Sequence, residues 1–158
     1  MKPYFTILLV TVLSACSIQQ VPAQLCVDIR YNHGDYLDLQ AVATAFSQSR
    51  NLRDFEQMLN DNRYRLSNLD LNNDGFIDYL RVEQYSEYEE HVIEVQAVLG
   101  RNYYQTVATL YIWRDRFGYE QIQIVGHESI YGRNFIIEPV FHRRPVIVRW
   151  LWDFRSPR

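Results

Sequence analysis

The most constraining feature of this sequence is a change in the spacing of its apolar residues near Phe76. Upstream of Phe76 apolar residues recur at helical spacing, whereas downstream they alternate with polar residues in steps of two. The alternating stretches are 76–82, 92–99, 107–113 and 119–125, with a short fifth at 135–137. The links between them are short, while parallel strands need a crossover of about a dozen residues or more. The sequence therefore predicts an antiparallel meander.

Two short helices are predicted upstream of the strands. Each begins with a side chain that can accept hydrogen bonds from free backbone N–H groups, Asp38 in the first helix and Asn51 in the second, which has Asp54 as a capping partner. The apolar residues that follow share one face of each helix. They are Leu39, Val42, Ala43 and Phe46 in the first helix, and Phe55, Met58 and Leu59 in the second. We expect these faces to cover the aliphatic side of the sheet.

The predicted fold class is therefore α+β, with two short N-terminal helices packed on an antiparallel β-meander of about four to five strands. This domain is expected to span residues 36–140. Hydrophobic residues make up 47% of the chain and charged residues 22%, a composition that supports a packed core and argues against disorder. The net charge of −3 makes nucleic acid an unfavourable partner.

Residues 1–23 are predicted to form an export signal. Lys2 precedes an apolar run of about 12 residues, which is too short to span a bilayer as a helix but has the length of a signal-peptide core. Residues 13–16 (Leu-Ser-Ala-Cys) resemble a lipobox, which predicts cleavage before Cys16 and lipidation of Cys16. A second small-residue motif predicts cleavage after Ala23 instead. The sequence does not decide between these two cleavage sites.

The export signal also predicts a location for the protein. We expect the mature chain to be secreted or to lie in the cell envelope, either in the periplasm or anchored at the outer membrane through Cys16. Residues 24–35 contain polar and turn residues and are predicted to form a tether. The other cysteine is Cys26, and because the two thiols lack Cys-x-x-Cys spacing, the sequence has no redox motif.

One motif carries recognisable chemistry, the nine-residue segment 70–78, which we call the 70–78 loop. It reads D-x-N-x-D-G-x-x-D and matches the first nine positions of an EF-hand calcium loop. Calcium prefers oxygen ligands, and Gly75 at position 6 permits the sharp turn that such loops require. The predicted calcium ligands are the side chains of Asp70, Asn72, Asp74 and Asp78 and the backbone carbonyl of Phe76.

The 70–78 loop departs from the EF-hand in two ways. Position 12, a bidentate Glu in the full motif, is Arg81 here, and the residues that follow the loop alternate as in a strand. A helix-loop-helix EF-hand is therefore excluded, and we expect Ile77 to anchor a shorter loop in the core. A metal-free turn is the alternative, because Asn and Asp side chains readily bond to their own backbone. The sequence leaves both interpretations open.

The C-terminal segment 141–158 differs in composition from the predicted domain. Over residues 140–158 five arginines oppose one aspartate, giving a net charge of +4, and Trp150 and Trp152 flank Leu151. Tryptophan interleaved with arginine is typical of protein and membrane interfaces. The alternation over 145–152 is also compatible with an added strand. We expect this basic aromatic tail to pack loosely on the domain or to extend from it.

Five segments together resemble one protein family. They are 68–83 (NLDLNNDGFIDYLRVE), 95–109 (VQAVLGRNYYQTVAT) and 123–140 (QIVGHESIYGRNFIIEPV), with 38–43 and 54–56 upstream. The combination resembles an uncharacterised family of secreted or envelope proteins of Bacteroidota-type bacteria. The resemblance covers residues 35–150. It implies an exported protein without established catalytic residues.

The sequence favours binding over catalysis. The four histidines have no metal-ligand spacing, and the common nucleophile, metalloprotease, phosphate and dinucleotide motifs are missing. We therefore expect a non-enzymatic envelope protein with a calcium loop and a sheet surface for an unidentified envelope protein partner. Lipidated Cys16 would add association with a membrane. The alternative is an envelope enzyme or enzyme inhibitor that uses the aromatic face of the sheet.

Overall fold

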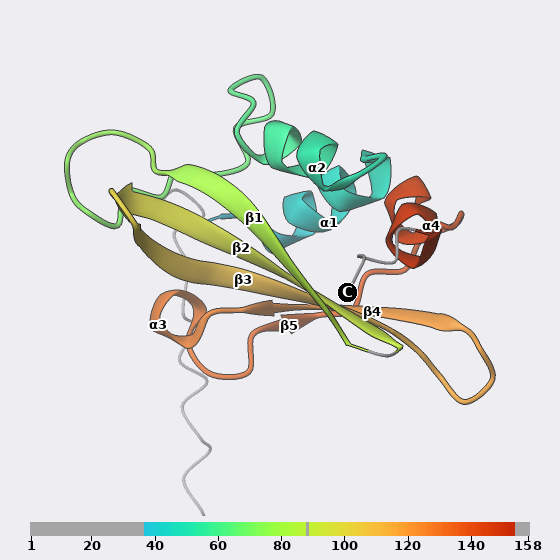
Figure 1. Ribbon diagram of the computed structural model, residues 1–158. Helices are drawn as coiled ribbons and strands as arrows, with labels where there is room; N and C mark the ends of the chain where they lie inside the picture. Colours follow the sequence, from blue (N-terminus) through green and yellow to red (C-terminus); the bar gives the residue numbers. More distant parts are fainter. Residues whose placement is uncertain (1–36, 88, 154–158) are drawn as a thin grey trace, which may run out of the picture. The chain divides into compact units, whose positions relative to one another are not determined.

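The computed structural model describes residues 37–87 and 89–153 (Figure 1). The predicted signal segment 1–23, the lipidation site Cys16 and the tether 24–35 lie outside the described residues. The helices are α1 (Leu39–Gln48), α2 (Leu52–Leu59), α3 (Glu128–Tyr131) and α4 (Val146–Asp153). The strands are β1 (Tyr79–Glu87), β2 (Glu90–Gly100), β3 (Tyr103–Arg114), β4 (Glu120–Gly126) and β5 (Ile136–Ile137). No helix of this described part is long and apolar enough to cross a membrane.

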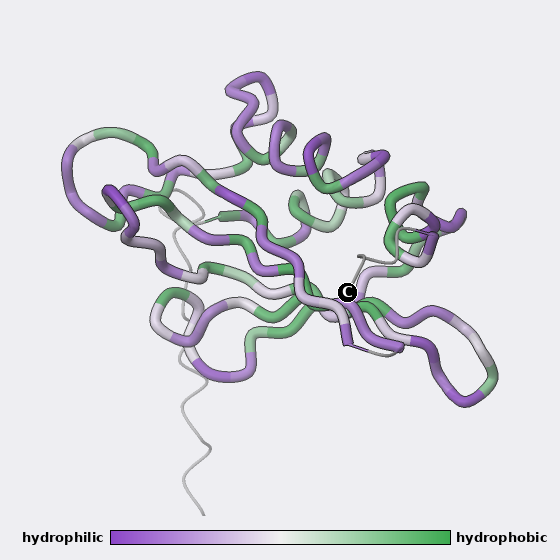
Figure 2. Tube along the Cα trace, viewed as in Figure 1, coloured by the Kyte–Doolittle hydropathy of each residue, from purple (hydrophilic) through white to green (hydrophobic). Residues whose placement is uncertain are grey.

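The five strands form one sheet in the order β1-β2-β3-β4-β5, and every neighbouring pair is antiparallel. Helices α1, α2 and α4 lie along one face of this sheet (Figure 1). Hydropathy alternates along the long strands (Figure 2). Burial alternates with it along β2, as expected for a strand with one face against the helices. The predicted α+β class is confirmed, with α1 and α2 preceding an antiparallel meander.

Local capping explains where the first two helices begin. The carboxylate of Asp38 accepts hydrogen bonds from the backbone N–H groups of Gln40 and Ala41. The side-chain oxygen of Asn51 accepts one from the N–H of Asp54. These bonds satisfy N–H groups that have no partner within a helix. Both predicted caps are confirmed.

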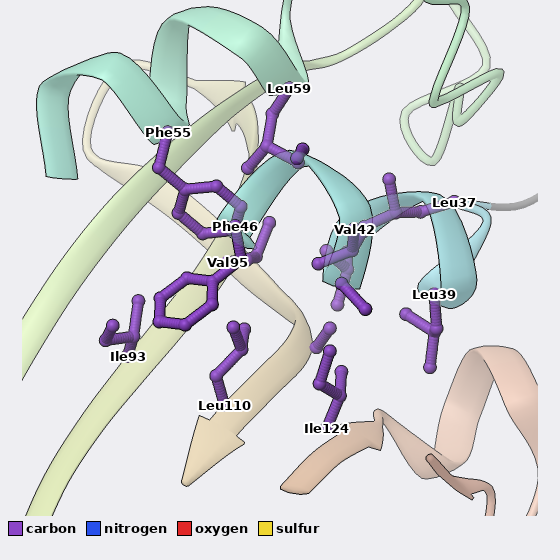
Figure 3. Close-up of a cluster of buried hydrophobic side chains, with 14 of the residues drawn as sticks. Leu37, Leu39, Val42, Phe46, Phe55, Leu59, Ile93, Val95, Leu110 and Ile124 are labelled. Atoms are coloured by element: carbon purple, nitrogen blue, oxygen red, sulfur yellow. The ribbon is translucent and has the colours of Figure 1, made fainter. Parts of the chain in front are cut away.

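The core lies between the sheet and the helices (Figure 3). The rings of Phe46 from α1 and Phe55 from α2 meet edge to face with their centroids 5.5 Å apart. Both side chains are fully buried, as are Ile93, Leu110 and Ile124 on the facing strands. This single cluster holds the two layers together, because each fully buried side chain of this size contributes about 1.5–3 kcal/mol.

A close approach at Gly126 ties the end of β4 to the first helix. A Cβ atom at this position would lie 2.5 Å from Cδ2 of Tyr131 and 3.1 Å from Leu39. The hydroxyl of buried Tyr131 donates a hydrogen bond to the carbonyl of Leu37 at 2.6 Å. Glycine is therefore required at this position, since any side chain would displace the Tyr131 ring from the core.

The C-terminal segment is a packed helix, and the prediction of a loose or strand-like tail is wrong. Ile147, Val148 and Leu151 of α4 are fully buried and belong to the main core. Their spacing puts them on one side of a helix, which an extended strand would not do. Pro145 precedes the first helical residue, where its missing N–H costs nothing. Residues 154–158 of the predicted tail lie outside the described part.

Candidate functional site

The 70–78 loop connects the end of the helical region to β1, and its two ends are fixed in the core. Leu69 and Leu80 on either side of the loop are buried. The backbone N–H of Asp78 donates to the carbonyl of Leu69 at 2.7 Å, which closes the loop at its base. The strand therefore begins at Tyr79 and not at Phe76 as predicted. The loop is a closed unit with buried anchors at both ends.

Side-chain oxygens of the first three predicted ligand positions turn onto the backbone of the loop. Asp70 accepts hydrogen bonds from the N–H groups of Asp74 at 3.0 Å and Gly75 at 2.9 Å. Asn72 accepts from the N–H of Asp74 at 3.0 Å, and Asp74 accepts from that of Phe76 at 2.9 Å. These bonds curl the loop around the side chains at positions 1, 3 and 5. The Asn72 amide also donates to the carboxylate of Asp74 at 3.0 Å.

Two residues of the loop have a left-handed backbone. Gly75 has φ +84° and Asn73 has φ +57°. Glycine adopts this region without a steric penalty, and asparagine tolerates it better than most residues. The Asn-Asp-Gly sequence therefore provides the reversal of direction that brings Asp70 back toward Asp74.

Asp78 differs from the other two carboxylates because it is buried. Its exposed fraction is 6%, and its carboxylate accepts a hydrogen bond from the N–H of Leu71 at 2.7 Å. Burial raises the pKa of Asp78, the Leu71 N–H opposes that rise, and the negative charges of Asp70 and Asp74 raise the pKa further. The three carboxylates are thus electrostatically coupled, and a cation at the loop would relieve their repulsion.

The predicted anchor of the loop is wrong. Ile77 is 58% exposed and Phe76 is 77% exposed, so neither side chain inserts into the core. Leu71 packs partly buried against the core instead. The bond between the Asp78 N–H and Leu69 turns the residues before β1 outward, and Figure 2 shows the apolar stretch just before this strand.

Arg81, at the twelfth position of the motif, cannot act as a calcium ligand, because its side chain is cationic and forms other contacts. Its guanidinium forms an ion pair with Glu83 and lies 4.0 Å from the centroid of the Tyr104 ring. The loop also contacts the far end of β2, where the Asn72 amide lies 3.5 Å from the carbonyl of Leu99. Across residues 37–87 and 89–153, no three His, Cys, Asp or Glu side chains gather closely enough to form a metal-ligand cluster. Any cation site here depends on the amide and backbone oxygens as well.

A cleft of about 630 Å³ lies beside the loop, between it and the end of α2. Its lining includes Asp61 and Asp78. Hydrogen bonds from Arg63 lower the pKa of Asp61 to about 2, and that carboxylate is therefore already paired. Asp78 is likewise bonded to Leu71. Asp61 and Asp78 thus line the same cleft, and each carboxylate already accepts hydrogen bonds from other groups.

Sequence reasoning missed the side chains that protect the outer edge of β1. The Asn60 amide accepts from the N–H of Leu80 at 2.8 Å and donates to its carbonyl at 2.6 Å. Glu56 accepts from the N–H of Val82 at 2.8 Å and from the hydroxyl of Tyr79 at 2.7 Å. Side chains of α2 and of its C-cap residue Asn60 thus replace a neighbouring strand along this part of the edge. The pairs are 20 and 26 residues apart, so no local pattern reveals them.

The sheet face opposite the helices is polar and aromatic. The pairing registers place Tyr85, Val92, Tyr111 and Gln123 in one row across β1 to β4, and Glu83, Glu94, Thr109 and Val125 in the next. Glu94 accepts hydrogen bonds from Gln96 at 2.7 Å and from Thr106 at 3.4 Å. This mixture of aromatic, amide and acidic groups can bind a partner through stacking and hydrogen bonds.

In comparisons with protein-family models, curated proteins and solved structures, the chain matches none.

Proposed function

We propose that this is a non-enzymatic, exported protein of the bacterial cell envelope whose 70–78 loop binds calcium. The observation that carries the proposal is the arrangement of Asp70, Asn72 and Asp74, whose side-chain oxygens turn onto the N–H groups of the same short loop. Calcium binds six to eight oxygens in flexible geometry, and all the predicted ligands offer oxygen. Weak affinity, with a Kd of about 10⁻⁴–10⁻³ M, is sufficient outside the cytoplasm.

The role of the cation in this proposal is structural. Three carboxylates lie within nine residues. Burial raises the pKa of Asp78, and the charges of Asp70 and Asp74 raise it further. A divalent cation would neutralise this repulsion and stabilise the folded state by RT ln(1 + [L]/Kd), about 2.7 kcal/mol at a hundredfold excess over Kd. The loop would then hold β1 at a fixed angle to the end of α2.

The proposal includes an anchor and a partner surface. The lipobox-like residues 13–16 support lipidation of Cys16, and a Cys16→Ser variant should then lose lipid labelling and membrane association. The polar and aromatic sheet face carrying Tyr85 and Tyr111 supports binding of an envelope protein partner. The resemblance to exported Bacteroidota-type proteins agrees with this location.

Thermal unfolding of the mature protein in chelator and in millimolar calcium tests the calcium proposal. We expect calcium to raise the melting temperature by roughly 5–10 °C. Magnesium should have a smaller effect, because it demands strict octahedral geometry and retains its water. Asp74→Ala should abolish the calcium shift. Asp153→Ala removes the same charge from an exposed site on α4 and serves as the matched control.

The outcomes of this experiment separate the two interpretations of the loop. Equal melting temperatures in chelator and calcium would leave a metal-free turn held by its own backbone bonds. A shift that persists in Asp74→Ala, or that Asp153→Ala removes equally, would place the cation elsewhere on the protein.

A further inference from the structure

His91 lies buried under the C-terminal helix, at the opposite end of β2 from the 70–78 loop. Its exposed fraction is 7%. The imidazole meets the indole of Trp152 from α4 edge to face, with the ring centroids 4.3 Å apart. The guanidinium carbon of Arg114 lies 4.1 Å from the centroid of the same Trp152 ring. A titratable side chain is therefore part of the contact that holds α4 on the sheet.

The hydrogen bonds around His91 assign its neutral form. Nδ1 lies 2.7 Å from the hydroxyl of Ser86 and 3.3 Å from the amide nitrogen of Gln84. An amide nitrogen can only donate, so Nδ1 is the acceptor and Nε2 carries the proton. Among residues 37–87 and 89–153, Nε2 of His91 and Nε1 of Trp152 are both buried and find no hydrogen-bond partner. Leaving a buried donor unsatisfied is unfavourable, and burial of the apolar face of α4 offsets this cost.

No negative charge is bonded to the His91 ring in the described part of the chain. From β1 the ring meets the neutral side chains of Gln84 and Ser86. From β3 the charge that acts on it is the guanidinium of Arg114, which lies 3.7 Å from the carboxylate of Glu120 on β4. The charged residues of α4, Arg149 and Asp153, are exposed. A proton on His91 would therefore create a buried imidazolium near another cation, with Nε2–H still lacking an acceptor.

We propose that His91 is an acid-sensitive latch for the C-terminal helix: the neutral imidazole holds α4 on the sheet, and its protonation releases α4. The released helix would uncover the core positions now filled by Ile147, Val148 and Leu151. The switch responds to the pH outside the cytoplasm if the protein is exported, but the latch itself requires neither export nor a calcium site.

The direction of the pH effect follows from burial. Burial lowers the pKa of His91 from its ordinary value of about 6.5, and the positive charge of Arg114 lowers it further. Between these two pKa values the released state binds the proton and the docked state does not, so docking weakens as the pH falls. The contribution of the latch is complete above about pH 6.5 and is lost below it, by about tenfold in the docking equilibrium for each pH unit in this range.

Hydrogen exchange of the full chain between pH 7.5 and pH 5 tests the latch. After correction for intrinsic exchange rates, the amides of α4 should lose protection as the pH falls below about 6.5, with a limiting slope of about tenfold per pH unit, while those of β2 and β3 change less. His91→Gln stays neutral and should flatten this dependence. His127→Gln removes an exposed histidine and should leave it unchanged. Equal pH dependence in wild type and His91→Gln would overturn the proposal.

A titration of the wild-type protein keeps the proposal testable even where His91→Gln fails to fold. The imidazole NMR signal of His91 should titrate below 6.5, and indole signals of Trp152 should change with the same midpoint. Arg114→Gln removes the neighbouring cation and should move this midpoint upward. A titration midpoint of His91 at or above 6.5, or Trp152 signals that do not change with the same midpoint, would show that the contact between His91 and Trp152 is only structural.

Discussion

The 70–78 loop and the C-terminal helix α4 contact opposite ends of β2, at Leu99 and His91, and they are held by different forces. In the loop, Asp70, Asn72 and Asp74 bond to backbone N–H groups within a few residues, while Phe76 and Ile77 face solvent. In α4 the side chains of Ile147, Val148 and Leu151 are fully buried, and Val146, Arg149 and Asp153 are exposed. The loop is organised by polar contacts within itself, and the helix by burial against the rest of the domain.

The difference predicts different sensitivities. Short-range polar contacts among charged groups depend on cations and on protonation, because each carboxylate interacts with the others. Burial of aliphatic side chains depends on their shape and volume and needs no bound cation. Mutations in the two regions should therefore differ both in size and in their response to calcium.

The largest effect is expected from Leu151→Ala in α4. Leu151 is fully buried in the main core, and truncation of such a leucine costs about 2–5 kcal/mol in the free energy of unfolding. Val146→Ala in the same helix is the matched control, since Val146 is 57% exposed and should change stability by less than about 0.5 kcal/mol. Urea unfolding at neutral pH measures both. Equally small losses would mean that α4 packs only loosely.

The second largest effect is expected from Asp78→Asn, whose change in stability relative to wild type should differ in sign between chelator and calcium. Asparagine keeps an oxygen for the N–H of Leu71 but removes a buried charge. The folded-state pKa of Asp78 is raised, so its favourable contribution is present at low pH and lost as the pH rises through that pKa. In chelator the variant should therefore gain stability relative to wild type between pH 4 and pH 7. In calcium it should lose part of the melting shift.

The contrast between chelator and calcium provides the check on this variant. Thermal melts of wild type and Asp78→Asn at pH 4 and pH 7, with and without calcium, give the four differences needed. A variant that is less stable in all four conditions would show that Asp78 acts only through its hydrogen bond to Leu71.

The third effect concerns the backbone of the loop. Gly75 has φ +84°, and no heavy atom of the described residues lies within 4 Å of an added Cβ, so Gly75→Ala adds strain without a clash. We expect a loss of about 1 kcal/mol in the free energy of unfolding. Gly100→Ala is the matched control, because its surroundings are equally open and its φ lies outside the left-handed region. Similar values for the two variants in chemical denaturation would exclude backbone strain at the loop.

The sequence predicts the parts of the fold that depend on neighbouring residues. The caps at Asp38 and Asn51 and the strand alternation act over a few residues, and the structure confirms them. The Asn-Asn-Asp-Gly turn chemistry at residues 72–75 is equally local, and Asn72 and Asp74 do bond to nearby backbone N–H groups. Its use for calcium stays a prediction, because the same bonds also stabilise a metal-free turn.

The errors come from contacts between distant residues. The Val146–Asp153 segment is rich in β-branched residues, which favour a strand locally, and only burial against α1 and the sheet stabilises it as a short helix. The direction of Ile77 depends on the bond that closes the loop at Leu69, and the protection of β1 depends on Glu56 and Asn60 from α2. None of these partners is adjacent in the sequence.

The smallest effect is expected at Ile77→Ser. The side chain is 58% exposed and lies outside the core, so the loss of stability should stay below about 0.5 kcal/mol, although an isoleucine is replaced by a polar residue. Leu71→Ser is the matched variant, because Leu71 packs partly buried against the core and should cost clearly more. Urea unfolding in chelator measures both without interference from a cation. If Ile77→Ser proves the more destabilising of the two, Ile77 is the residue that anchors the loop, and the contrast between an outward-facing loop and a buried α4 fails.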